Sequence, residues 1–195
     1  MQVFFYLLLS ALLLAFSYLV FRRLVRREYE DRGRLSPLVS GAQLLVFLGF
    51  FSFPYQFNPP EWALPWIRST NQPTWLFIAG LLCICLGMAL AFGIMAWFGF
   101  RVAFGVQTEG LRTAGPYRIS RNPQVVGGYL MVIGPALQRP SHYFLGWICI
   151  FAVIMHWMIL TEEEHLTRIF GQEFRDYCRE VPRYLRIGHR RAVQA

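Results

Sequence analysis

The sequence predicts an all-α polytopic membrane protein with about five transmembrane helices, and three observations support this fold class. Hydrophobic residues make up 55% of the 195 residues and the mean hydropathy is +0.38, whereas a soluble domain is usually about 45–50% apolar. The apolar residues are concentrated in long blocks. The basic residues, all of them arginines, flank these blocks, so the net charge of +8 indicates membrane topology rather than nucleic-acid binding.

Five apolar blocks are expected to form the transmembrane helices, and the fourth is expected either to cross with a tilt or to cross only in part. The first lacks the basic start of a signal peptide and is long enough to span, since about 20 residues cover the ~30 Å hydrocarbon core. We therefore interpret it as a retained anchor. The fourth block is short and turns at Arg139-Pro140-Ser141 into the fifth, which predicts a tight helical hairpin. The blocks are residues 2–21, 38–57, 75–100, 125–138 and 142–160.

The connections between the blocks predict the orientation in the membrane. Residues 22–34 form a basic loop in this interpretation, and nearly all other arginines lie in residues 101–124 or in the tail. The even-numbered connections hold only Arg68 and Arg139. By the positive-inside rule the N-terminus is outside and the C-terminus cytoplasmic. We expect a multi-pass protein of a prokaryotic inner membrane, with residues 1–100 as N-terminal helices and 101–195 as the catalytic part.

Glycines and cysteines add local expectations. Four glycines in the third block, Gly80, Gly87, Gly93 and Gly99, allow close helix approach. The four cysteines have no metal-finger spacing, so neither a metal site nor a redox pair is expected.

Residues 115–128 form a turn-rich polar segment between two apolar blocks. Gly115-Pro116 predicts a turn, and Pro123 predicts a helix that begins with proline in its first turn. Arg118 and Arg121 place two cations at the membrane boundary. They are either topology charges or groups that bind a carboxylate or phosphate.

A second polar cluster, Glu162-Glu163-Glu164-His165, follows the last apolar block. This helix is expected to continue to Phe170 and to end at Gly171, with a charged, helical, cytosolic tail behind it. The three carboxylates are either a solvated helix end or a site for an ammonium or sulfonium ligand. His156, inside the block, is either functional or an interhelical hydrogen-bonding residue. The remaining tail arginines, Arg183 among them, are expected to face water or headgroups.

Both polar clusters carry a family resemblance. Gly115-Pro116-Tyr117-Arg118-x-x-Arg121-Asn122-Pro123-x-x-x-Gly127 resembles the GPYRxxRHPxYxG signature of the isoprenylcysteine carboxyl methyltransferase and phospholipid methyltransferase superfamily. Glu162-Glu163-x-x-Leu166, then Phe170-Gly171-x-x-Phe174-x-x-Tyr177 and Val181-Pro182, resemble its second half. The resemblance covers residues 107–184. It departs at Asn122, a histidine in the family, at Val125, a tyrosine, and at Met158, where isoprenylcysteine enzymes place a substrate-binding arginine.

The resemblance implies an integral membrane methyltransferase that uses S-adenosyl-L-methionine at the cytosolic face. Gly127 is expected to allow close approach of helix and ligand. The implied catalytic residues are Arg121 for anion binding, with Glu163 or His165 as base if the acceptor is an amine. The implied cofactor-binding residues are Gln107, Glu109, Gly110, Leu111, Arg112, Tyr117, Asn122, Pro123, Gln124, Val125 and Glu162.

The expected partners are the lipid bilayer and a lipophilic or small-molecule methyl acceptor, without nucleic acid or an obligate protein partner. Two alternatives remain. Tyr177-Cys178-x-x-Val181-Pro182 is also similar to the tail of NADPH-dependent membrane sterol reductases, and the departures at Asn122 and Val125 allow a non-catalytic protein on the same core. Without a GxGxxG motif, a soluble Rossmann methyltransferase is not expected.

Overall fold

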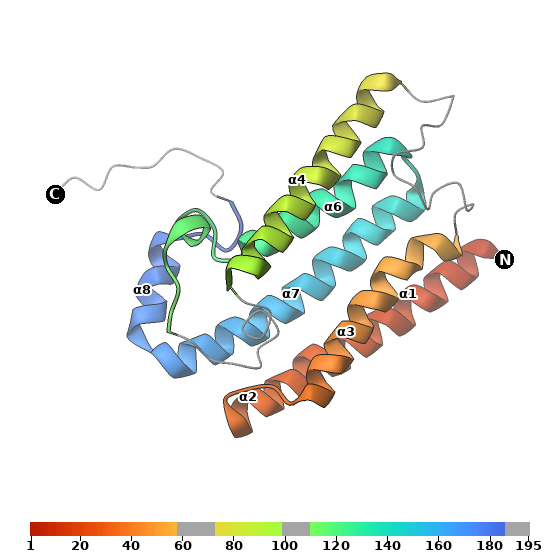
Figure 1. Ribbon diagram of the computed structural model, residues 1–195. Helices are drawn as coiled ribbons and strands as arrows, with labels where there is room; N and C mark the ends of the chain where they lie inside the picture. The colour runs from red at the N-terminus through yellow and green to blue at the C-terminus, as the bar shows by residue number, and fades with distance from the viewer. Residues whose placement is uncertain (58–72, 99–109, 186–195) are drawn as a thin grey trace.

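The computed structural model describes residues 1–57, 73–98 and 110–185, and within these ranges the secondary structure is helical without strands. The tryptophan-containing segment before the third block, the end of that block, and Gln107 and Glu109 lie outside the described residues. Figure 1 shows the long helices lying roughly side by side, with α7 between the α1–α3 pair and the α4–α6 pair.

The first helix continues far beyond its apolar block. α1 (Gln2–Tyr18) runs through a π-helical stretch, η1 (Leu19–Val25), into α2 (Arg26–Arg32), and ends at Gly33 with φ of +66°. The expected basic loop is therefore mostly helix, and that expectation was wrong. Ion pairs one turn apart explain the extension, because they support helix. They join Arg26 to Glu30, Arg27 to Asp31 and Arg32 to Glu28.

Helix α3 (Pro37–Ser52) begins at an N-cap, Ser36, whose hydroxyl accepts from the Val39 amide. Glu28 accepts from both the amide and the hydroxyl of Ser36 at 2.6 Å, so α2 fixes the start of α3. The helix is shorter than the expected span, because a 3₁₀ turn, Phe53–Gln56, replaces its last part. It packs on α7 through Phe50, which stacks on Trp147 at a centroid distance of 4.9 Å.

Helix α4 (Thr74–Phe98) pairs with α6 (Pro123–Gln138), and both views show the two side by side. Glycines allow this contact: a Cβ atom at Gly80 would lie 2.5 Å from the Gly134 oxygen, and one at Gly87 would lie 2.6 Å from the Gly127 oxygen. Gly93 has open space around it.

This pairing bears on two expectations. The α6–α7 hairpin is connected as expected, but α6 packs most closely on α4. Gly127 allows close approach of the α4 backbone, at Ala91 and Gly87, and its expected contact with a ligand stays a prediction.

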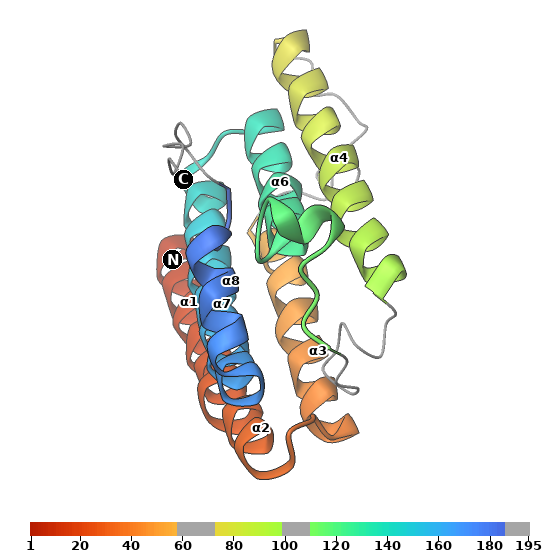
Figure 2. The ribbon, with the colours of Figure 1, turned by 90° about the vertical axis from the view of Figure 1, so that its left-hand side faces the viewer.

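Helix α7 (His142–Phe170) starts at the N-cap Ser141, crosses the bundle and ends at Gly171, whose φ is +53°. The expected continuation to Phe170 is confirmed. α8 (Gln172–Glu180) then turns back, so that α2, α8 and the 3₁₀ turn Gly115–Arg118 lie at one end of the bundle, called here the polar end (Figure 2).

Three of the described helices are long and apolar enough to cross a membrane: Gln2–Arg32, Thr74–Trp97 and His142–Phe170. α3 and α6 have 16 residues each, which at 1.5 Å per residue is about 24 Å, short of the ~30 Å core. The apolar-helix architecture is confirmed, and the count of five spans and the orientation stay predictions.

Candidate functional site

The three adjacent glutamates of α7 point to three different places. The apolar part of the helix ends at Leu160, so these side chains lie beyond the expected membrane-spanning segment. Successive residues of a helix are rotated by about 100°. Glu162, Glu163 and Glu164 therefore face different neighbours, and the sequence cluster is not one spatial cluster of charge.

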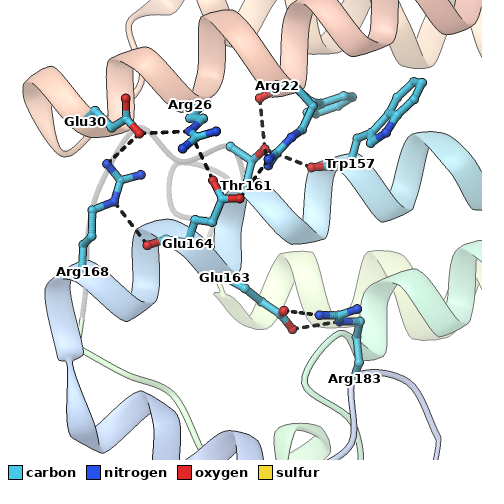
Figure 3. A network of polar contacts seen from close by, with 10 residues as sticks. Arg22, Arg26, Glu30, Trp157, Thr161, Glu163, Glu164, Arg168 and Arg183 are labelled. Atoms are coloured by element: carbon cyan, nitrogen blue, oxygen red, sulfur yellow. Dashed lines mark hydrogen bonds and ion pairs between the residues drawn. The ribbon is translucent and has the colours of Figure 1, made fainter.

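Glu164 ties α7 to the N-terminal helix. Its carboxylate pairs with Arg22 at 2.9 Å and with Arg26 at 3.3 Å, and Glu30 bridges Arg26 and Arg168 at 3.0 and 3.2 Å (Figure 3). This network joins residues about 140 positions apart in sequence. Glu164 is thus engaged in holding the polar end together.

Glu163 is shared by two arginines. Arg121 reaches one carboxylate oxygen at 2.7 Å. Arg183 binds both oxygens through Nε and Nη2, as Figure 3 shows. The side chains of Arg121 and Glu163 are only 14% and 17% exposed. Arg183 was expected to face water or headgroups, and that expectation was wrong, because the chain after α8 folds back onto the loop.

The returning tail holds the loop by its backbone. The Arg121 amide donates to the Pro182 oxygen at 2.9 Å, and the Asn122 side-chain amide donates to the Arg183 oxygen at 3.1 Å. The Tyr177 hydroxyl donates to the Tyr117 oxygen at 2.7 Å. Asn122, proposed from the sequence as a cofactor contact, is buried at this junction. Asn122 therefore also holds the loop against the tail.

Unlike Glu163 and Glu164, Glu162 is not paired with an arginine among the described residues. The pKa values of Tyr117 in the loop and of Tyr29 in α2 are both raised. Burial is the main cause in each case, and the negative charge of Glu162 is the second. Burial, with Glu163 nearby, raises the pKa of Glu162 to about 7. No ion pair or hydrogen bond to this carboxylate occurs among the described residues. A carboxylate in such surroundings favours a cationic ligand.

His165 lies one turn after Glu162 and stacks on Tyr29, with ring centroids 3.8 Å apart and planes 10° apart. The side chain is buried and its Nε2 atom has no hydrogen-bond partner. Burial, followed by the charge of Arg168, lowers the pKa of His165 to about 4. The imidazole is therefore neutral at pH 7 and offers an unused acceptor or donor beside Glu162.

The remaining candidates divide between the loop and the core. The Tyr117 hydroxyl donates to Gln124 at 3.2 Å, Pro123 starts α6, and Arg112 lies 5.9 Å from the Trp97 ring. Leu111 packs near Phe174 and Tyr177, and Val125 is buried in the main core. Gly110 is exposed, as are Arg118 and, on α7, His156.

Among the residues that the structure describes, no group of three or more His, Cys, Asp or Glu gathers as metal ligands. Sequence reasoning missed two residues at this site, Tyr29 and Arg183. Tyr29 comes from a segment expected to be a loop and outside the resemblance, and no local signal marks it. Arg183 directly follows the Val181-Pro182 element, which was the available signal.

The fold and site define a class of helical protein with membrane-length apolar helices and one polar end, where the Glu162 carboxylate has no ion-pair partner among the described residues. Residues 75–173, just over half of the chain, match the family described as Phospholipid methyltransferase. The chain belongs to this family.

Curated relatives agree with this assignment. The chain is 33% identical over 119 residues to a protein-S-isoprenylcysteine O-methyltransferase from Rattus norvegicus, covering 57% of this chain and 42% of the relative. The Mus musculus protein of the same name is 32% identical over an equal stretch. The nickel-cobalt-cadmium resistance protein NccN from Alcaligenes xylosoxydans xylosoxydans is 27% identical over 117 residues, 60% of this chain and 54% of the relative. The chain therefore spans about half the length of these relatives. No solved structure matches.

Proposed function

We propose that this protein is an integral membrane methyltransferase that binds S-adenosyl-L-methionine at a cytosolic polar end and methylates a lipophilic or small-molecule acceptor. Family membership supports methyl transfer as the reaction class. The observation that carries the cofactor assignment is Glu162, a carboxylate without an ion-pair partner among the described residues, one turn before the buried His165–Tyr29 ring stack. Its charge contributes to the raised pKa values of Tyr29 and Tyr117.

The residues around Glu162 fit the cofactor's chemistry. Its carboxylate would hold the ammonium group, and aromatic rings attract cations within about 6 Å of their centroids, so Tyr117 and Tyr29 suit an ammonium or sulfonium. The unpartnered Nε2 of His165 can accept or donate one hydrogen bond. With a pKa of about 4 it is a weak base. We therefore assign His165 to orienting the ligand rather than to taking a proton.

Arg121 and Glu163 are assigned to positioning in this proposal. Each neutralises the other in a largely buried contact, and together with Arg183 they hold the loop that bears Tyr117 and Asn122. Holding this loop still has a direct catalytic use, because methyl transfer is an in-line displacement whose main demand is alignment of donor and acceptor.

When bound, S-adenosyl-L-methionine supplies an electrophilic methyl group on a sulfonium. The chain's own task is to exclude water and to align the acceptor. A partly dry pocket favours an anionic acceptor, because charge is neutralised as the methyl group is transferred. The buried Tyr117 and His165 provide such surroundings at this end of the bundle.

Binding of radiolabelled S-adenosyl-L-methionine to the detergent-solubilised protein tests the assignment. We expect Glu162→Gln to weaken binding at least about tenfold, since it removes a charge-assisted contact of about 1.5–3 kcal/mol. Glu173→Gln, which removes an exposed carboxylate of α8, is the matched control and leaves binding unchanged. Equal binding by Glu162→Gln and the wild type contradicts the site.

Two further measurements address the reaction. Excess NADPH is expected not to displace the label, and displacement would favour the reductase alternative. Lipid and small-molecule profiles of cells with and without the protein are expected to differ by the mass of one methyl group in at least one compound. Profiles without such a difference, together with absent cofactor binding, would favour the non-catalytic alternative.

A further inference from the structure

An open cavity of about 640 Å³ lies between α2, α7, α8 and Arg121 of the loop, and Glu162 is not among its lining residues. Its floor on α7 is formed by Leu160, Glu163, Glu164 and Thr167, and residues three and four apart share one face of a helix. Glu162 projects from the opposite face of α7. The cavity is therefore distinct from the cofactor position assigned to Glu162, although Arg121 and Glu163, which hold the loop, also line it.

Arginines dominate the charge around this cavity. Arg26, Arg121 and Arg168 line it, and Arg22 and Arg183 pair with its carboxylates from behind. These five cations face three carboxylates, Glu30, Glu163 and Glu164, so the described residues of the cluster carry an excess of two positive charges.

Two of these arginines remain accessible. The side chains of Arg26 and Arg168 are 45% and 40% exposed although both are ion-paired, and Figure 3 shows both where α2 and α7 face each other. The Arg121 Nε atom is buried without a hydrogen-bond partner. Guanidinium groups with donors to spare suit phosphate, whose oxygens accept paired hydrogen bonds.

An exposed stripe on α7 leads directly into the cavity. Leu145, Cys149, Val153 and His156 are exposed and recur every three or four residues, and Leu160 continues the stripe as part of the cavity floor. α1 and α6 pack on other sides of α7. At 1.5 Å per residue the stripe is about 22 Å long. This exceeds the thickness of one leaflet, which is about half of the ~30 Å hydrocarbon core.

We propose that the cavity and this stripe bind an anionic membrane lipid, with its phosphate among Arg26, Arg121 and Arg168 and one acyl chain along α7. The excess positive charge selects an anionic head, and the continuous stripe below it selects a lipid over free phosphate. His156, an exposed residue of the stripe that the proposed methyl transfer does not use, belongs to the acyl-chain path. Arg26 comes from the N-terminal helices, outside the family match.

A photoreactive phosphatidylglycerol with a diazirine in its acyl chain tests the site in the full-length protein. Crosslinks are expected in the peptide that covers residues 145–160. Unlabelled phosphatidylglycerol is expected to compete, whereas phosphatidylcholine and inorganic phosphate at the same concentration are not. Crosslinks spread evenly over α3 and α4, or equal competition by phosphatidylcholine, would refute a specific site. Competition by inorganic phosphate would refute the lipid as occupant.

Charge-removal variants provide an independent comparison. Arg26→Gln with Arg168→Gln is expected to weaken phosphatidylglycerol binding at least about tenfold, since an arginine near an anionic surface contributes about a fivefold factor. The matched control is Arg27→Gln with Arg175→Gln, exposed arginines that do not line the cavity, and it should stay within about twofold of the wild type. Equal loss in both double variants would overturn the proposal.

Cofactor binding, measured in the same samples, distinguishes a variant that fails to fold from one that has lost only lipid binding. S-adenosyl-L-methionine binding is expected to be unchanged in the Arg26 and Arg168 double variant, which shows that the protein is folded if the proposed function holds. If that variant unfolds, the crosslink positions in the wild type still decide the question. Lost cofactor binding in Glu162→Gln with unchanged lipid crosslinking would support two separate sites.

Discussion

Glu163 offers the most direct test of how the polar end is held together, through the substitution Glu163→Gln. Glutamine keeps the size of the side chain and one acceptor oxygen but removes the charge that Arg121 and Arg183 share. Since this contact joins the loop to α7 and the tail, its loss is expected to loosen residues 117–122 more than the centre of α7.

The size of the effect follows from burial. Removing one partner of a fully buried pair costs about 3–5 kcal/mol, and an exposed pair contributes about 0–1 kcal/mol. Arg121 and Glu163 are 14% and 17% exposed, whereas Arg183 is 33% exposed and can be hydrated. We therefore expect about 2–3 kcal/mol for local opening, a factor of about 30–150 at 1.36 kcal/mol per tenfold.

Hydrogen exchange measures this opening, because the Arg121 amide is protected by its bond to the Pro182 oxygen. The matched control, Asp176→Asn, removes the carboxylate of the Asp176–Arg179 pair, whose side chains are 53% and 74% exposed. Its effect on the same peptide should stay below about 1 kcal/mol. Similar exchange in both variants would refute the idea that Glu163 organises the loop and the tail.

Two further predictions concern pH and helix packing. The pKa of Glu162 is raised from 4.5 to about 7 in the folded protein, so its contribution to stability is present below pH 4.5 and is lost as the pH rises through 7. The melting temperature of the unliganded wild type should therefore fall relative to Glu162→Gln between pH 5 and 8, and parallel curves would contradict this. Gly87→Ala should lower the free energy of unfolding by about 1–3 kcal/mol through overpacking. Gly93→Ala is the control, because Gly93 has open space around it, and it should not lower stability. Equal melting temperatures for the two variants would count against the close α4–α6 contact.

Local sequence signals predicted the helices well where the information was short in range. Ser141 caps α7, Pro123 begins α6, and Gly171 ends α7 with a positive φ. The continuation of the first helix through Arg32 also has a local signal, namely oppositely charged pairs four residues apart such as Arg26 and Glu30. The same arginines also fit membrane topology, so their presence alone does not predict helix.

The helical, membrane-type architecture, the family, and the link between the loop and the acidic helix end could all be predicted from the sequence. These follow from hydrophobic blocks, caps and motifs, each readable within a few residues. The partner of each charge depends on the three-dimensional fold. Glu164 pairs with Arg22, and Glu163 pairs with Arg121 and Arg183, whereas Glu162 has no ion-pair partner among the described residues. Adjacent residues of a helix face directions about 100° apart, so neighbours in sequence contact different elements, which lie between 20 and 142 positions away along the chain.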